Sequence, residues 1–107
     1  MRDIRFIPRI ALLLGLMGLM LAMTPAAQAD EFERDMRRGH EALDRADYRD
    51  AEDAFDRARR QAVAENQEAE ALYWRAFALH RLGSRRDLRQ ASRALEHLED
   101  LDVARSL

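Results

Sequence analysis

Beyond residue 29 the chain contains almost none of the residues that favour β-strands or interrupt helices. Residues 30–107 include no Pro, no Ile and no Thr, and their only Gly and Val residues are Gly39, Gly83, Val63 and Val103. β-Branched residues favour strands, whereas Ala, Leu, Arg and Glu, which are abundant here, are good helix formers. We therefore predict an all-α fold in which short turns join the helices.

The first 29 residues have the pattern of a secretory signal peptide. Three Arg precede an apolar run over residues 10–23, and Ala27 and Ala29 follow with the spacing of a cleavage site. We predict cleavage after Ala29 and a periplasmic or secreted mature chain. The alternative is an uncleaved segment that anchors the chain to the inner membrane. That run of 14 residues is shorter than the roughly 20 residues that a membrane-spanning helix needs.

The predicted mature chain is small and acidic, and it contains no cysteine. Residues 1–29 hold three Arg and one Asp of the chain's 18 basic and 20 acidic residues, so residues 30–107 carry 15 basic and 19 acidic residues. Its net charge is therefore about −4, whereas a nucleic-acid-binding protein needs a basic face, so we expect no nucleic-acid partner. No disulfide can support so small a core, so helix packing or a partner must stabilise it.

Apolar residues at three- and four-residue spacing predict four helices. Their expected ranges are residues 31–45, 48–64, 66–82 and 85 to about 98. The third of these is apolar around most of its circumference. Such a helix must be covered from more than one direction, so we place it between the second and the fourth.

The expected ends of these helices carry typical capping residues. Asp47 and Asn66 are the predicted N-caps of the second and third helices, because a short polar side chain can accept a free backbone N–H. Gly83 is expected to end the third helix in the left-handed conformation. Ser84 and Asp87 resemble a capping box at the start of the fourth.

Two stretches of the chain are similar to each other. "GHEALDRADYRDAEDAFDRA" begins at Gly39 and "AFALHRLGSRRDLRQASRALEHL" begins at Ala76. Each has a small residue in one helix and the spacing Ala-x3-Phe or Ala-x3-Leu in the next. This pattern resembles the tetratricopeptide repeat, a helical hairpin of about 34 residues. The resemblance implies two stacked antiparallel helix pairs, a fragment of an α-solenoid. They would form one domain over residues 30–101, with repeats at 32–68 and 69–101 and a tail at 102–107.

The resemblance also implies packing roles. In this family the small residue lets two helices approach closely, and the aromatic or Leu residue fills the space between repeats. The matching positions in the first copy are Gly39, Tyr48, Ala51, Phe55 and Ala58. Those in the second copy are Ala76, Leu88, Ala91, Leu95 and Leu98, and Trp74 is expected to pack in the central helix.

Proteins of this family are binding scaffolds without an active site, and the first helix of each pair lines their concave side. By position, the resemblance implies a partner-binding set of Met36, His40, Leu43, Glu70, Tyr73, Phe77, His80 and Arg81. Tyr73 and Phe77 are the strongest candidates, because aromatic side chains offer a large contact area at a low entropic cost. The alternative is that both belong to the core.

The sequence contains no recognisable catalytic, metal or cofactor site. His40, His80 and His97 are scattered and lack the short spacing of a zinc-ligand pair. There is no Cys nucleophile and no glycine-rich phosphate loop, and no Ser lies in a nucleophile-elbow context. We therefore expect no enzyme activity, no metal and no cofactor.

These patterns predict an exported, non-catalytic scaffold that binds a protein or peptide. Its contact with the membrane would be limited to the signal peptide. One alternative is a structural protein that forms homo-oligomers through its exposed repeat ends. Another is a truncated relative of a longer repeat protein, because a stable stack normally needs three or more repeats.

Overall fold

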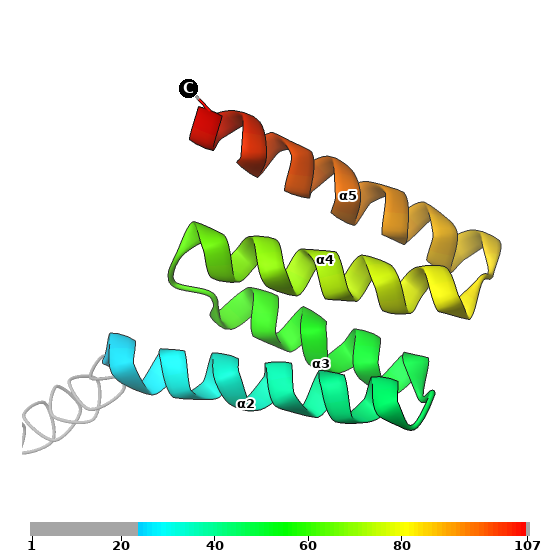
Figure 1. Ribbon diagram of the computed structural model, residues 1–107, viewed down its shortest axis with the longest axis horizontal. Helices are drawn as coiled ribbons and strands as arrows, with labels where there is room; N and C mark the ends of the chain where they lie inside the picture. Colours follow the sequence, from blue (N-terminus) through cyan, green and yellow to red (C-terminus); the bar gives the residue numbers. More distant parts are fainter. Residues whose placement is uncertain (1–23, 107) are drawn as a thin grey trace, which may run out of the picture.

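The computed structural model describes residues 24–106, and these residues form four α-helices and no strand (Figure 1). The helices are α2 (Pro25–Asp44), α3 (Tyr48–Gln61), α4 (Glu65–Leu82) and α5 (Arg85–Ser106). The all-α prediction is thus confirmed for this part of the chain. The three N-terminal Arg and the apolar run of the predicted signal peptide lie outside the described residues.

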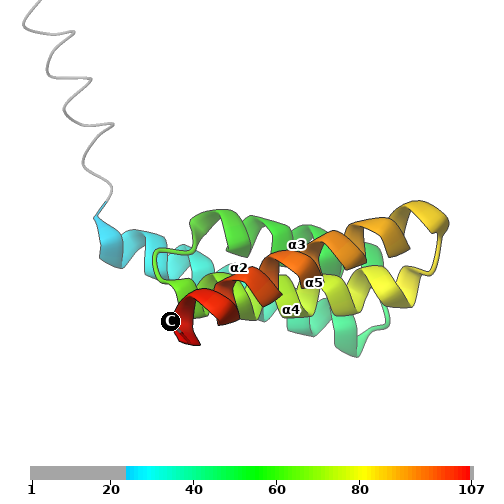
Figure 2. The same ribbon diagram turned by 90° about the horizontal axis from the view of Figure 1, so that it is seen from above.

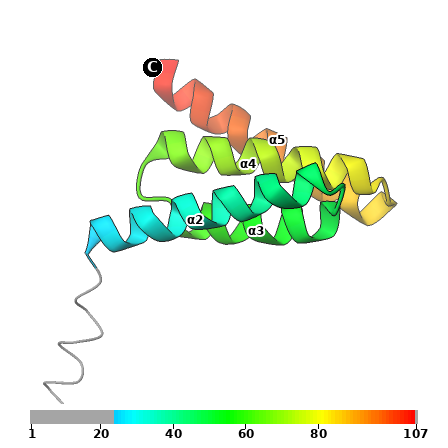
Figure 3. The same cartoon turned by 60° about the horizontal axis from the view of Figure 1, so that its bottom comes forward.

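Each helix packs against the next one along the chain, and consecutive helices run in opposite directions (Figures 1 and 2). The third of them, α4, therefore lies between α3 and α5, as expected from its apolar circumference. In a rotated view α2, α3 and α4 form one group, and the last turns of α5 lead away from it (Figure 3). This arrangement covers α4 on two sides and leaves a third side open.

Helix α2 begins at Pro25, six residues before the predicted start at residue 31. Thr24 is its N-cap: the hydroxyl accepts a hydrogen bond from the backbone N–H of Ala27 at 3.3 Å. A Pro at the first helical position is already restricted to a helical φ, so Thr24 and Pro25 together make a strong helix start. The predicted cleavage site after Ala29 consequently lies inside α2.

The start of α4 also differs from the prediction. Ala64, not Asn66, is its N-cap residue. The side-chain oxygen of Gln67 accepts hydrogen bonds from the backbone N–H groups of Val63 at 3.0 Å and Ala64 at 3.3 Å. A Gln at the third helical position can satisfy these donors without a polar cap residue, which is why the helix begins before Asn66. The preceding helix, α3, ends at Gln61 rather than at residue 64 because Ala62 is extended.

The other predicted caps are confirmed. Asp47 caps α3 by accepting the backbone N–H of Asp50 at 3.4 Å, and Gly83 ends α4 with a φ of 75°. Before α5, the hydroxyl of Ser84 accepts the backbone N–H of Asp87 at 3.0 Å and donates to the Asp87 carboxylate at 2.6 Å. No Gly or Pro follows, so α5 continues to Ser106 through residues 102–106, which were predicted to be a tail.

The main core lies where α2, α3 and α4 meet. Its buried members are Phe32, Met36, Ala42, Ala51, Phe55, Ala58, Ala71 and Ala78. At its centre the ring of Phe55 packs against His40, Trp74 and the backbone at Gly39. A smaller cluster of Leu72, Ala76 and Ala94 joins α4 to α5. The second hairpin thus has less apolar packing than the first.

Candidate binding site between α4 and α5

A groove of about 290 Å³ runs between α4 and α5 on the open side of α4. It is lined by Tyr73, Ala76, Phe77 and His80 from α4, and by Leu88, Ala91, Ser92 and Leu95 from α5. Four of these side chains are large, apolar and exposed to solvent: 51% for Tyr73, 41% for Phe77, 40% for Leu88 and 50% for Leu95. We call this surface the α4–α5 groove.

The helical spacing of the sequence explains why these side chains gather. Along α4, Tyr73, Phe77 and His80 recur at intervals of four and three residues, so they lie on one face. Leu72 and Leu79, on other faces of α4, are buried. Tyr73 and Phe77 are therefore outside the core, on the one face that neither α3 nor α5 covers.

Most residues with a predicted packing role are buried or half-buried, but Leu88 and Leu95 are exposed. Gly39, Ala51, Phe55, Ala58, Ala76 and Ala91 are buried, and Tyr48, Trp74 and Leu98 are half-buried. Leu88 and Leu95 were both expected to pack within the repeats, with Leu95 in the space between them, and instead they are exposed at the edge of the groove. The reason is that no helix of the described chain lies over this side of α5.

The part of the predicted binding set that lies on α2 is not accessible as expected. Met36 is 4% exposed and belongs to the main core, so it cannot contact a partner. His40 is half-buried, with its ring 5.2 Å from that of Phe55 and 4.7 Å from that of Trp74. Leu43 packs partly against the same core. On this side of α2, Trp74 of α4 packs against His40 and the main core.

The α4 members of the predicted set divide into two groups. Tyr73, Phe77 and His80 line the groove, whereas Glu70 and Arg81 are exposed beside it. Arg81 points toward α3, where it donates a hydrogen bond to the Tyr48 hydroxyl at 3.0 Å and lies over that ring at 5.1 Å. Prediction from sequence missed the contribution of α5. The apolar spacing of its residues predicts internal packing.

No family model, curated protein or solved structure matches this chain. Within residues 24–106, no group of three potential metal-ligating side chains comes together. No helix in that range is long and apolar enough to cross a membrane.

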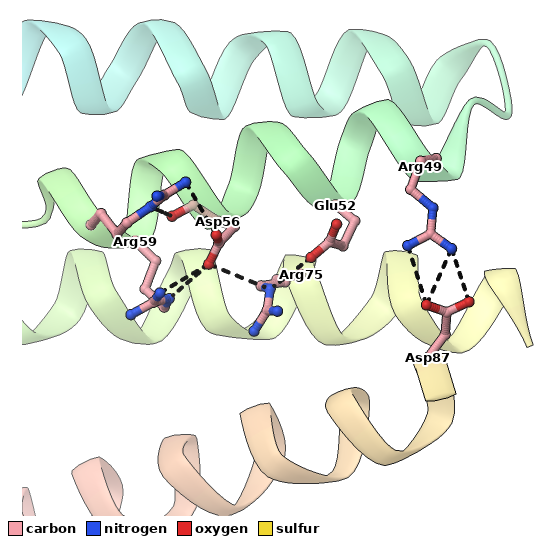
Figure 4. Close-up of polar contacts among 7 residues, drawn as sticks. Arg49, Glu52, Asp56, Arg59, Arg75 and Asp87 are labelled. Carbon is pink, nitrogen blue, oxygen red and sulfur yellow. Dashed lines mark hydrogen bonds and ion pairs between the residues drawn. The ribbon is translucent and has the colours of Figure 1, made fainter. Parts of the chain in front are cut away.

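On another side of the molecule, ion pairs connect α3 to α4 (Figure 4). Arg75 of α4 donates from Nε to Glu52 at 3.0 Å and lies 3.6 Å from an oxygen of Asp56. Glu52 is 7% exposed, and its burial raises the pKa of the carboxyl above the ordinary value despite the opposing effect of Arg75. The pair satisfies the buried charge of Glu52, which would otherwise be costly.

A second connection joins α3 to α5 (Figure 4). Arg49 donates to both carboxylate oxygens of Asp87, at 3.0 and 3.2 Å, in a bidentate arrangement. The hydrogen bond from Ser84 and the contact with Arg49 lower the pKa of Asp87, and the same contact raises the pKa of Arg49. These charged groups are bonded to one another, which indicates a structural role in holding the helices together.

Replacement of Asp87 by Asn tests this role through pH. The pKa of Asp87 lies below its ordinary value of 3.8, so its charge stabilises the fold above that pH and the contribution is lost as the pH falls through the lowered pKa. We expect D87N to unfold at a lower temperature than the parent at pH 7, with the two converging below pH 3.8. Thermal unfolding followed by circular dichroism across pH measures this. D100N, at an exposed position of α5, is the control, and an equal effect of both substitutions would contradict the assignment.

Proposed function

We propose that the chain is an exported, non-catalytic scaffold of tetratricopeptide-like helical hairpins that binds a protein or peptide in the α4–α5 groove. One observation carries the proposal: four large apolar side chains are exposed around a single groove in a chain of which 36% is charged. Contiguous apolar patches on an otherwise charged surface are typical of interaction sites.

The shape of the groove favours a polypeptide over a small molecule. Small-molecule pockets usually enclose their ligand and place several polar groups to orient it. The α4–α5 groove is open along two helices, and its polar lining groups are those of Tyr73, His80 and Ser92. An apolar strip between two helices matches the way amphipathic helices are bound in grooves.

Two further observations support the assignment to helical hairpins of this kind. Gly39 of α2 lies directly against the ring of Phe55 in α3, which is the close approach that the repeat pattern requires. The three turns between the described helices are short, and each helix packs on its neighbour along the chain. Export rests on the N-terminal pattern of three Arg, an apolar run and small residues.

A photo-activated cross-linking residue at position 77 tests the proposed site. The full-length protein carrying p-benzoylphenylalanine in place of Phe77 would be produced in the cells that make the parent protein. After irradiation, its adducts would be identified by mass spectrometry. We expect adducts with a polypeptide at position 77. The same residue at Arg37, an exposed position on α2, is the control. Equal adducts at both positions, or none at position 77, would overturn the proposal.

A further inference from the structure

The α4–α5 groove is the counterpart of a groove that is filled elsewhere in the same chain. On the first hairpin, α4 lies over α2 and α3: Ala71 and Ala78 are in the main core, and the ring of Trp74 contacts those of His40 and Phe55. On the second hairpin no described helix takes the equivalent place. The side chains exposed in the α4–α5 groove therefore correspond to side chains that α4 covers on the first hairpin.

The charges around the groove are separated into two ends. His97 of α5 lies 3.3 Å from Glu68 of α4, which fixes the antiparallel register of the two helices. Glu70 is consequently at the same end of the groove as Glu96 and Glu99, which border a hollow beside Leu95. The opposite end, next to the turn at Gly83, carries His80 and Arg85.

Helical spacing places these charges on the same face as the apolar residues. On α4 the sequence Glu70, Tyr73, Phe77, His80 advances by three, four and three residues. On α5 the face contains Arg85, Leu88, Ser92, Leu95, Glu96 and Glu99. The resulting surface is acidic at one end, apolar in the middle and basic at the other end.

Such a surface is complementary to itself. A twofold axis through its middle brings two apolar centres together and places each basic end on the acidic end of the other copy. The surface is also large enough to form an interface. Helices of 18 and 22 residues, each about 10 Å wide, present on the order of 500 Å² per copy, which is typical of a modest, reversible association.

We propose that the α4–α5 groove binds a second copy of the chain, forming a twofold-symmetric dimer in which Arg85 of each copy faces Glu96 and Glu99 of the other. This inference rests on the proposed function, because it names the partner of the same groove. Twofold symmetry requires the basic end of each copy to lie opposite the acidic end of the other copy.

Charge reversal tests this requirement. Arg85→Glu and Glu99→Arg are each expected to weaken dimerisation at least tenfold in sedimentation equilibrium of the purified protein, because each places like charges at positions 85 and 99 across the interface, twice per dimer. An equimolar mixture of the two variants should form a heterodimer, since the glutamate introduced at position 85 of one variant then faces the arginine introduced at position 99 of the other, and Arg85 faces Glu99. Arg85→Glu puts an acidic residue in the first turn of α5, where the helix dipole favours it, so the fold is preserved. Arg37→Glu on α2 is the control and should dimerise like the parent.

The results separate this inference from the proposed function. A parent protein that is monomeric at all concentrations, a dimer that neither reversal weakens, or a mixture that does not recover association would each overturn the dimer. If position 77 still cross-links to a different protein in those cases, the proposed function stands without the dimer. Cross-links from position 77 to residues of α4 or α5 in a second copy, together with recovery in the mixture, support the dimer.

Discussion

Replacement of Phe55 by Ala is expected to lower the free energy of unfolding by about 3–5 kcal/mol. Phe55 is 0% exposed, and its ring contacts residues from both neighbouring helices, with centroid distances of 5.2 Å to His40 and 6.3 Å to Trp74. Removing the ring loses its burial and leaves a cavity between three helices. A domain of this size has only about 5–10 kcal/mol of stability, so the variant should be close to unfolding at 37 °C. Urea unfolding followed by circular dichroism measures the loss.

Phe77→Ala is the matched control for that experiment. Its ring is 41% exposed in the groove and packs in no core cluster, so its removal should cost about 1 kcal/mol or less. Both variants should be compared with the parent at one low protein concentration, at which association through the groove is minimal. Losses of similar size for Phe55 and Phe77 would show that the main core is not centred on Phe55.

The fold class and the first hairpin could be predicted because local physics decides them. The near absence of β-branched residues indicated helices, and Asp47 and Gly83 marked helix ends that the structure confirms. Gly39 indicated a close approach, and the ring of Phe55 lies against it. These features depend on residues that are near in sequence or in one hairpin.

The start of α2 and the end of α5 could not be predicted for a different reason. Thr24 and Pro25 make a good helix start, but they follow an apolar run and read as part of a signal peptide. At the other end, residues 102–106 have weak apolar periodicity, although no helix-breaking residue is present. Apolar periodicity indicates which face of a helix packs, but not where the helix ends. The predicted C-terminal end of this helix was therefore too early.

The candidate site depends on which helices cover which, and sequence similarity between the two copies cannot show this. Met36 and Tyr73 occupy equivalent positions, each three residues before the small residue, yet Met36 is 4% exposed and Tyr73 is 51% exposed. Helix α4 covers the first copy and no described helix covers the second. The pairing of Arg49 with Asp87 was equally hidden, because 38 residues separate them and many other Arg were available.

Substitution of Gly39 by Ala is the second large expected effect, and its sign is the informative part. In an exposed helix this change would stabilise by about 1 kcal/mol, because Gly is the poorer helix former. Here a Cβ at position 39 would lie 2.6 Å from Cζ and 2.7 Å from Cδ1 of Phe55, and the buried ring cannot move away from His40 and Trp74. Overpacking of this kind costs about 1–3 kcal/mol, which exceeds the gain in helix propensity, so we expect a net loss of up to about 2 kcal/mol in urea unfolding.

A double-mutant cycle with Phe55→Leu shows whether the contact causes that loss. The shorter Leu side chain lacks the ring atoms nearest to position 39, so Gly39→Ala should cost less in the Phe55→Leu background than in the parent, by about 1 kcal/mol or more. Arg38→Ala, one residue earlier on the exposed face of α2, controls for changes in helix propensity and should have the same small effect in both backgrounds. Strictly additive effects of Gly39→Ala and Phe55→Leu would contradict the close packing of α2 on α3. The alignment of the two hairpins, and with it the comparison that identifies the α4–α5 groove as uncovered, would then lose its main structural support.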